Sequence, residues 1–152
     1  MRIRPFEQGD EEAVVALWER CGLLRPWNDP RKDIRRKLAV QRELFLVGEV
    51  DAAVVAVAMA GYDGHRGWVN YFAVDPDHRH EGLGRQLMDD VEQRLRRLGC
   101  PKINVQIRGD NEAAIGFYAS IGFAEDDCVS MGKRLEVDGP GGPQRRVDRR
   151  GR

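Results

Sequence analysis

The chain lacks the marks of several large classes of protein. Its three cysteines, Cys21, Cys100 and Cys128, are far apart and form no Cys-x-x-Cys pair, so neither a disulfide framework nor a zinc site is expected. No apolar run approaches the roughly 20 residues that cross a bilayer, and residues 1–5 contain no apolar signal region. We therefore expect a cytoplasmic protein with reduced thiols and no membrane partner.

An excess of charge of either sign is also missing. The 25 Lys and Arg residues balance the 25 Asp and Glu residues, which disfavours a nucleic-acid partner. A chain of 152 residues suits one domain with a single core, which we expect over residues 1–136. Residues 137–152 are rich in glycine, proline and arginine, and we expect them to form a disordered tail.

The most informative stretch predicts a strand, a glycine-containing loop and a helix. Residues 68–74 are β-branched and aromatic, and Pro76 ends the strand because it has no N–H for the ladder. Apolar residues recur at helical spacing over residues 83–98. Gly82 and Gly84 allow a ligand to approach the backbone at the start of this helix, where unpaired amides favour phosphate.

This loop lacks both the Gly-x-Gly-x-x-Gly dinucleotide pattern and the Gly-Lys-Ser/Thr of a Walker A loop. Two glycines by themselves favour a plain tight turn. In its context, however, Arg79-x-x-Gly82-x-Gly84 after Phe72-Ala73-Val74 resembles motif A of the Gcn5-related N-acetyltransferases (GNAT). In that superfamily the loop amides hold the pyrophosphate of acetyl-coenzyme A.

A second signature lies at residues 111–123, where Asn111 precedes a short helix that contains Tyr118 and ends in Gly-Phe. This pattern resembles motif B of the same superfamily. One predicted helix and one predicted strand separate the two motifs, as that fold requires. The resemblance covers roughly residues 2–135, and its two motifs in the right order favour the acetyltransferase interpretation over a plain turn.

The resemblance implies an α/β (α+β) fold with a mixed, mostly antiparallel, six- to seven-stranded sheet flanked by helices on both faces. Two central strands part to admit the pantetheine arm, here residues 68–74 and 102–107. Segments 24–30 and 61–67 are similar to a small bacterial branch of the superfamily known as YpeA. The pattern of the chain predicts strands over residues 2–6, 44–49, 53–60, 68–74 and 102–107, and one or two short strands between residues 123 and 135. It also predicts helices that begin after Asp10, Asp29, Gly82 and Asn111, with Asp10, Asp29 and Asp110-Asn111 as the N-caps of their helices.

Carried over onto this chain, the resemblance implies acetyl-coenzyme A as co-substrate. The backbone amides of Phe72 and Val74, which flank Ala73, would pair with pantetheine and the thioester carbonyl. Asn111 would bind the pantetheine arm, and Tyr118 would lie near the sulfur as general acid. The pyrophosphate would be held by the loop and first helical turn, namely Arg79, His80, Glu81, Gly82, Leu83, Gly84 and Arg85.

The catalytic base is less defined, because the positions where some relatives carry a glutamate hold Trp68 and Gln106 here. The alternatives are a water chain or the loop residues Asp63 and His65, although a solvated turn is the simpler interpretation of these two residues. An α-amino group, with a pKa of about 8, loses its proton without a base more readily than a lysine, with a pKa of about 10.4. This difference favours an α-amine or a small-molecule amine.

The expected partner is a small-molecule or peptide amine, and a homodimer is possible. Trp27, Tyr62 and Trp68 are candidate walls of its pocket. His78 and His80 lie among carboxylates, but Arg79 between them argues against a metal site.

Two other functions remain open from the sequence. One is a non-catalytic acyl-coenzyme A sensor that acts through a partner protein. The other, which the neutral remainder of the chain makes the least favoured, is the binding of a nucleic acid or an anionic surface through the basic residues of the helix that begins at Pro30 and through the arginine-rich tail.

Overall fold

A computed structural model describes residues 1–139 of the chain. One sheet contains five strands in the order β1-β2-β3-β4-β5, which are Arg2–Pro5, Phe45–Val50, Ala53–Tyr62, Gly67–Val74 and Ile103–Val105. The first four strands are antiparallel, and β5 runs parallel to β4. The sheet is therefore mixed and mostly antiparallel, as predicted, but the six to seven strands that we expected are not found in the described part of the chain.

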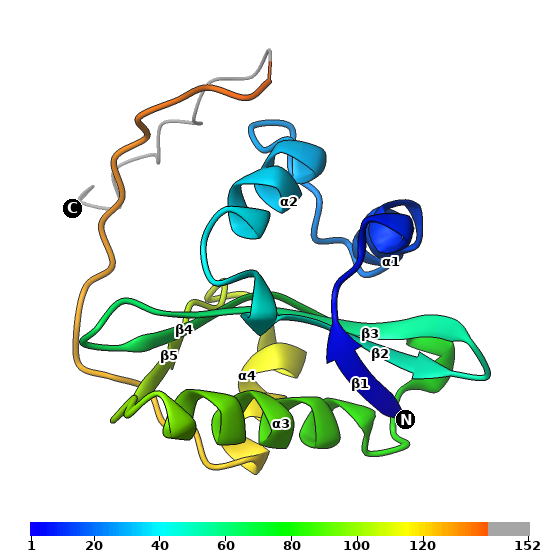
Figure 1. Cartoon of the computed structure of the whole chain (residues 1–152). Helices are drawn as coiled ribbons and strands as arrows, with labels where there is room; N and C mark the ends of the chain where they lie inside the picture. The colour runs from blue at the N-terminus through cyan, green and yellow to red at the C-terminus, as the bar shows by residue number, and fades with distance from the viewer. Residues whose placement is uncertain (140–152) are drawn as a thin grey trace.

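Helices cover both faces of the sheet (Figure 1). The helices α1 (Glu11–Arg20) and α2 (Pro30–Leu38) lie on one face, and α3 (Leu83–Arg97) and α4 (Glu112–Ser120) lie on the other. Each pair of helices closes its own apolar cluster against the sheet. Within residues 1–139, no helix is both long enough and apolar enough to cross a membrane.

The strands predicted between residues 123 and 135 do not form. The C-terminal strap, which we define as residues 124–139, instead runs from the end of α4 past the end of the sheet toward α2 (Figure 1). Its apolar side chains Val129, Met131 and Leu135 are 86%, 90% and 92% exposed. Because no sheet face buries these side chains, their strand-like pattern produces no strand.

The C-terminal strap is held against the rest of the protein by side-chain contacts rather than by the backbone hydrogen bonds of a sheet. Lys102 pairs with Asp126, and Arg134 donates to the carbonyl oxygen of Trp27 at 3.2 Å. Asp138 accepts two hydrogen bonds from Arg36. The predicted disordered tail falls mainly on residues 140–152, which lie outside the described residues.

The predicted helix caps have different outcomes. Asp29 accepts hydrogen bonds from first-turn amides of α2, and Asn111 does so for α4, as predicted. Asp10, which was expected to cap α1, makes no such bond to that helix. Its carboxylate instead accepts two hydrogen bonds from Arg4 at 2.7 and 2.9 Å and one from the Glu7 amide at 2.8 Å. The Arg4 guanidinium, which the sequence does not place beside Asp10, explains the difference.

The buried Asp10 carboxylate links stability to pH. Its hydrogen bonds to Arg4 hold the Asp10 pKa below its usual range, so its contribution is present above an ordinary Asp pKa of about 3.9 and is lost as the pH falls through the lower folded value. We expect Asp10→Asn to lower the free energy of unfolding at pH 7 by about 1–3 kcal/mol. Urea unfolding should show this difference narrowing in acid, while the exposed control Asp89→Asn changes little. A difference that is the same at pH 7 and at pH 3 would contradict this account.

Candidate functional site

The strand β4 is interrupted near its middle by a β-bulge. Two β4 residues, Tyr71 and Phe72, lie opposite the single β3 residue Ala58. Tyr71 has φ +51°, a left-handed conformation that is uncommon for a residue other than glycine. The bulge places Asn70 and Tyr71 toward α1 and α2, while Phe72 packs with the cluster beneath α3 and α4.

Contacts from two helices hold the bulge. The ring of Trp18, on α1, stacks on the ring of Tyr71 with centroids 4.1 Å apart, and its indole N–H donates to the Tyr71 carbonyl at 3.3 Å. The Tyr71 hydroxyl donates to Asp33, on α2, at 2.7 Å. Burial, together with the Asp33 carboxylate, raises the pKa of Tyr71 well above its usual range. Nothing in the local sequence marked Tyr71 as special, and it was not predicted to belong to the site.

The pairing of β4 with β5 ends at Val69 and Val105, although β4 continues to Val74. The Asp75 amide donates to the Val55 carbonyl of β3 at 2.7 Å. Since successive amides of a strand point alternately to its two sides, the Val74 amide points away from β3, and the two-residue period places the Phe72 amide on the same side. These two amides therefore point to the side of β4 on which β5 no longer pairs. An extended ligand lying there could accept hydrogen bonds from them.

The loop that follows β4 presents free backbone donors. Within the described chain, no acceptor is found for the amides of residues 79–85. Gly82 has φ +77° and precedes the first residue of α3. Open amides at a helix N-terminus provide a site for an anionic group such as a phosphate.

The two loop glycines have different roles. A Cβ atom at Gly82 would meet nothing within 4 Å, whereas one at Gly84 would lie 3.0 Å from the Phe117 ring of α4. Gly84 therefore lets α3 and α4 pack closely, and the close approach of a ligand to its backbone stays a prediction.

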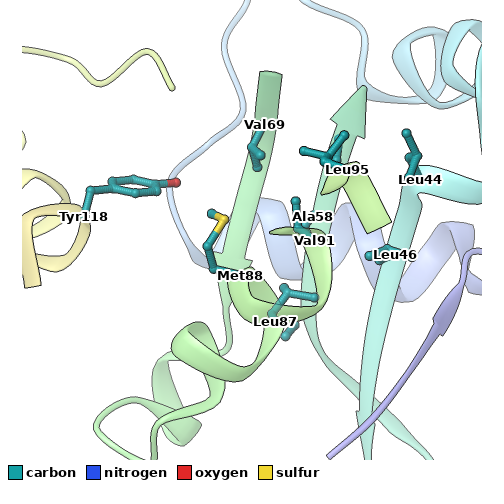
Figure 2. Packing of buried hydrophobic residues seen from close by; sticks show 11 residues of the cluster. Leu44, Leu46, Ala58, Val69, Leu87, Met88, Val91, Leu95 and Tyr118 are labelled. Carbon is teal, nitrogen blue, oxygen red and sulfur yellow. The ribbon is translucent and has the colours of Figure 1, made fainter. Parts of the chain in front are cut away.

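Tyr118 lies on α4 among the aromatic rings of Phe72, Phe117 and Phe123. Figure 2 shows its ring reaching from α4 toward β4, with the hydroxyl at the end nearer that strand. Its side chain is buried, and burial raises the pKa of Tyr118 to about 12. Full proton transfer to a thiolate with a pKa of about 8.5 would cost about 5 kcal/mol, so this hydroxyl is suited to donate a hydrogen bond rather than to lose its proton.

Asn111, Asp63 and His65 are exposed side chains. The Asn111 side-chain oxygen accepts from the Ala114 amide at 3.1 Å to cap α4, which leaves its NH₂ group available as a donor. Asp63 accepts from the amides of His65 and Arg66, both at 2.7 Å, in the turn between β3 and β4. These bonds hold the pKa of Asp63 below its usual range, which weakens it as a base.

The predicted pocket walls Trp27, Tyr62 and Trp68 are not brought together. Tyr62 and Trp68 occupy successive paired positions of the β3–β4 register, so they face opposite sides of the sheet. Trp27 lies in the loop before α2, where the Arg108 guanidinium sits 5.8 Å above the centre of its ring.

A cavity of about 370 Å³ lies instead between α2 and the bulge. It is lined by Asn28, Asp33, Arg36, Lys37, Met59, Asn70 and Tyr71. One feature of the sequence pointed to this cavity, namely the basic surface of the helix that begins at Pro30. A larger cavity, of about 440 Å³, lies by α1 and the β2–β3 turn. Its charged side chains form ion pairs within the lining, Arg4 with Asp10 and Glu49, and Arg20 with Asp75.

Comparison with known proteins gives a consistent picture. Residues 10–123 match the model of the acetyltransferase (GNAT) family. A protein named acetyltransferase from Yersinia enterocolitica is 51% identical over 138 residues, which are 91% of this chain and 98% of that protein.

Solved structures share the fold. The ribosomal-protein-S18-alanine N-acetyltransferase from Escherichia coli matches with a TM-score of 0.68 and 25% identity, covering 82% of this chain and 78% of that one. The aminoglycoside N-acetyltransferase AAC(6')-Iy in complex with CoA has a TM-score of 0.68 at 17% identity, covering 88% and 98% of the two chains.

The left-handed backbone at Gly82 can be tested by substitution. We expect Gly82→Ala to lower the free energy of unfolding by about 1–2 kcal/mol, because a Cβ atom is strained in that conformation. Gly116 lies within α4 and also has open space around it, so Gly116→Ala should raise stability by about 0.5–1 kcal/mol. Chemical denaturation of the two variants measures both effects, and a change of the same sign in both would contradict the loop geometry.

Proposed function

The chain belongs to the GNAT family of acetyltransferases, and on this premise we propose that it is an N-acetyltransferase that transfers the acetyl group of acetyl-coenzyme A to a primary amine. The acceptor is a small molecule or a peptide. The observation that carries the proposal is the end of β4–β5 pairing at Val69 and Val105, on the same strand that leads to the open amides of residues 79–85. A linear donor with a thioester at one end and a diphosphate at the other suits this arrangement.

The chain's own backbone would provide most of the donor site. The amides of residues 79–85 would bind the pyrophosphate, and those of Phe72 and Val74 would bind the pantetheine arm and the thioester carbonyl. The NH₂ group of Asn111 would donate to the same arm. Because main-chain amides bind the donor, the side chains of residues such as His80 and Glu81 can change with little effect on the site. The structural neighbour in complex with CoA supports this choice of donor.

The proposed reaction is a direct attack on the thioester. The amine nitrogen forms a bond to the carbonyl carbon, the carbon–sulfur bond breaks, and coenzyme A leaves as its thiolate while the amine loses a proton. A backbone amide at the carbonyl oxygen stabilises the developing negative charge, and the Tyr118 hydroxyl donates a hydrogen bond to the departing sulfur. With Asp63 a weak base, the proton passes through water to solvent.

Binding of the donor tests the proposal directly. Calorimetry should detect acetyl-coenzyme A with an affinity in the micromolar range, weakened at least tenfold, or about 1.4 kcal/mol, by Gly82→Val, whose side chain covers the loop amides. Gly99 has a similar left-handed φ, +83°, and open space around it at the other end of α3. The matched control Gly99→Val should therefore bind acetyl-coenzyme A with the affinity of the wild-type protein. Absence of binding by the wild-type protein would refute the donor site.

Turnover tests the role of Tyr118. We expect Tyr118→Phe to lower kcat roughly 10²-fold while the dissociation constant for acetyl-coenzyme A stays the same, because the hydrogen bond to sulfur strengthens only as the thiolate forms. The measurement is thiol release across a panel of amines. Equal kcat values would remove the role assigned to Tyr118, and binding without thiol release from any amine would point to a sensor.

A further inference from the structure

One cation that lines the cavity between α2 and the bulge, Lys37, forms no ion pair within residues 1–139. Arg36 is neutralised by Asp33 at 2.9 Å and by Asp138, the nearer oxygen of which lies 2.6 Å away. The Lys37 ammonium makes no ion pair or hydrogen bond with any of residues 1–139. Its side chain is half-buried, and burial lowers its pKa against a smaller opposing effect of the Glu43 carboxylate. A partly desolvated cation with no partner is stabilised by an anion that enters the cavity.

The cavity adjoins the place where β4 and β5 part. Asn70, which lines the cavity, is the first β4 residue beyond the last pair, Val69 with Val105. Tyr71, the next residue, forms both the bulge and a cavity wall. A molecule bound beside Lys37 would therefore extend along Asn70 toward the position of the acetyl-coenzyme A thioester in the proposed function.

We propose that the acceptor is a small amino carboxylate whose carboxylate pairs with Lys37 and whose amine lies beside Asn70. This inference rests on the proposed function and assigns the substrate class of the same site. The volume of about 370 Å³ lies at the small end of ligand pockets and suits a molecule the size of an amino acid. Lys37, which forms no ion pair among the described residues, matches a monoanion, whereas the nearby Asp33 carboxylate would repel the larger charge of a dianion such as phosphate more strongly.

The rest of the lining fits both ends of such a molecule. The Asn28 oxygen already accepts from Arg134, which leaves its NH₂ group as a donor, and the Asn70 amide can donate or accept. Met59 offers an apolar wall to a side chain. The transfer converts the amino carboxylate and acetyl-coenzyme A into the N-acetyl amino carboxylate and free coenzyme A, with the amine proton released to solvent.

The test compares each acceptor with its carboxamide, which keeps the amine and removes the negative charge. The panel contains the twenty common amino acids, β-alanine and 4-aminobutyrate, and thiol release is the readout. For the preferred acceptor, wild-type kcat/KM should fall about tenfold or more for the carboxamide, as expected when a charged hydrogen bond is lost. The loss should appear mainly in KM.

Variants assign this preference to Lys37. Lys37→Met should abolish the difference between acid and amide, and Lys37→Arg should restore part of it. The matched control Lys32→Met, on the same helix but outside the cavity lining, should keep the preference. Calorimetry with acetyl-coenzyme A should give the same affinity for all three variants, which shows that each is folded.

The outcomes separate the two proposals. If wild-type protein does not bind acetyl-coenzyme A, the proposed function fails. If it binds the donor but acetylates the carboxamides as well as the acids, acetylates only amines without a carboxylate, or acetylates no member of the panel, the function can stand and this inference is overturned. Retention of the preference in Lys37→Met would also overturn it.

Discussion

The left-handed backbone at Tyr71 is the constraint on which the rest of the site depends. A non-glycine residue in this conformation costs about 1–3 kcal/mol, and it persists because two helices hold it. Stacking on Trp18 contributes about 0.5–1.5 kcal/mol, and the hydrogen bonds with Trp18 and Asp33 contribute similar amounts each. The bulge is therefore a property of the packed helices and the sheet together rather than of β4 alone.

The bulge also divides the site between the two faces of the sheet. It turns Asn70 and Tyr71 toward α2, where they line the cavity, and it leaves Phe72 against Tyr118 on the other face. In the proposed reaction, the donor thioester lies in the plane between these faces. The acceptor approaches from the α2 side, and the leaving sulfur meets the Tyr118 side. In this proposal, the irregular backbone at Tyr71 thus places the α2 cavity and the Tyr118 hydroxyl on opposite sides of the same thioester bond.

Elements whose signals lie close together in the sequence are predicted correctly, and elements that depend on remote residues are not. The prediction of a helix over residues 83–98 matches α3, at Leu83–Arg97, because its apolar spacing and the glycine that follows it are local signals. The strands predicted between residues 123 and 135 do not form, because no sheet face buries the apolar side chains of Val129, Met131 and Leu135. Asp10 fails as a cap of α1 because Arg4, from a different element, takes its carboxylate.

The sequence by itself determined the strand, the glycine loop and the helix that follows it, together with the family they belong to, because each of these signals lies within a few neighbouring residues. The tertiary structure alone decided the bulge, the cavity and the lack of an ion pair for Lys37 within residues 1–139. Their partners are remote: Tyr71 and Asp33 are separated by 38 positions, and Arg36 and Asp138 by 102. Which cation finds a counter-ion, and which amide is left without a strand, depends on the packing of distant segments, and no local pattern encodes that packing.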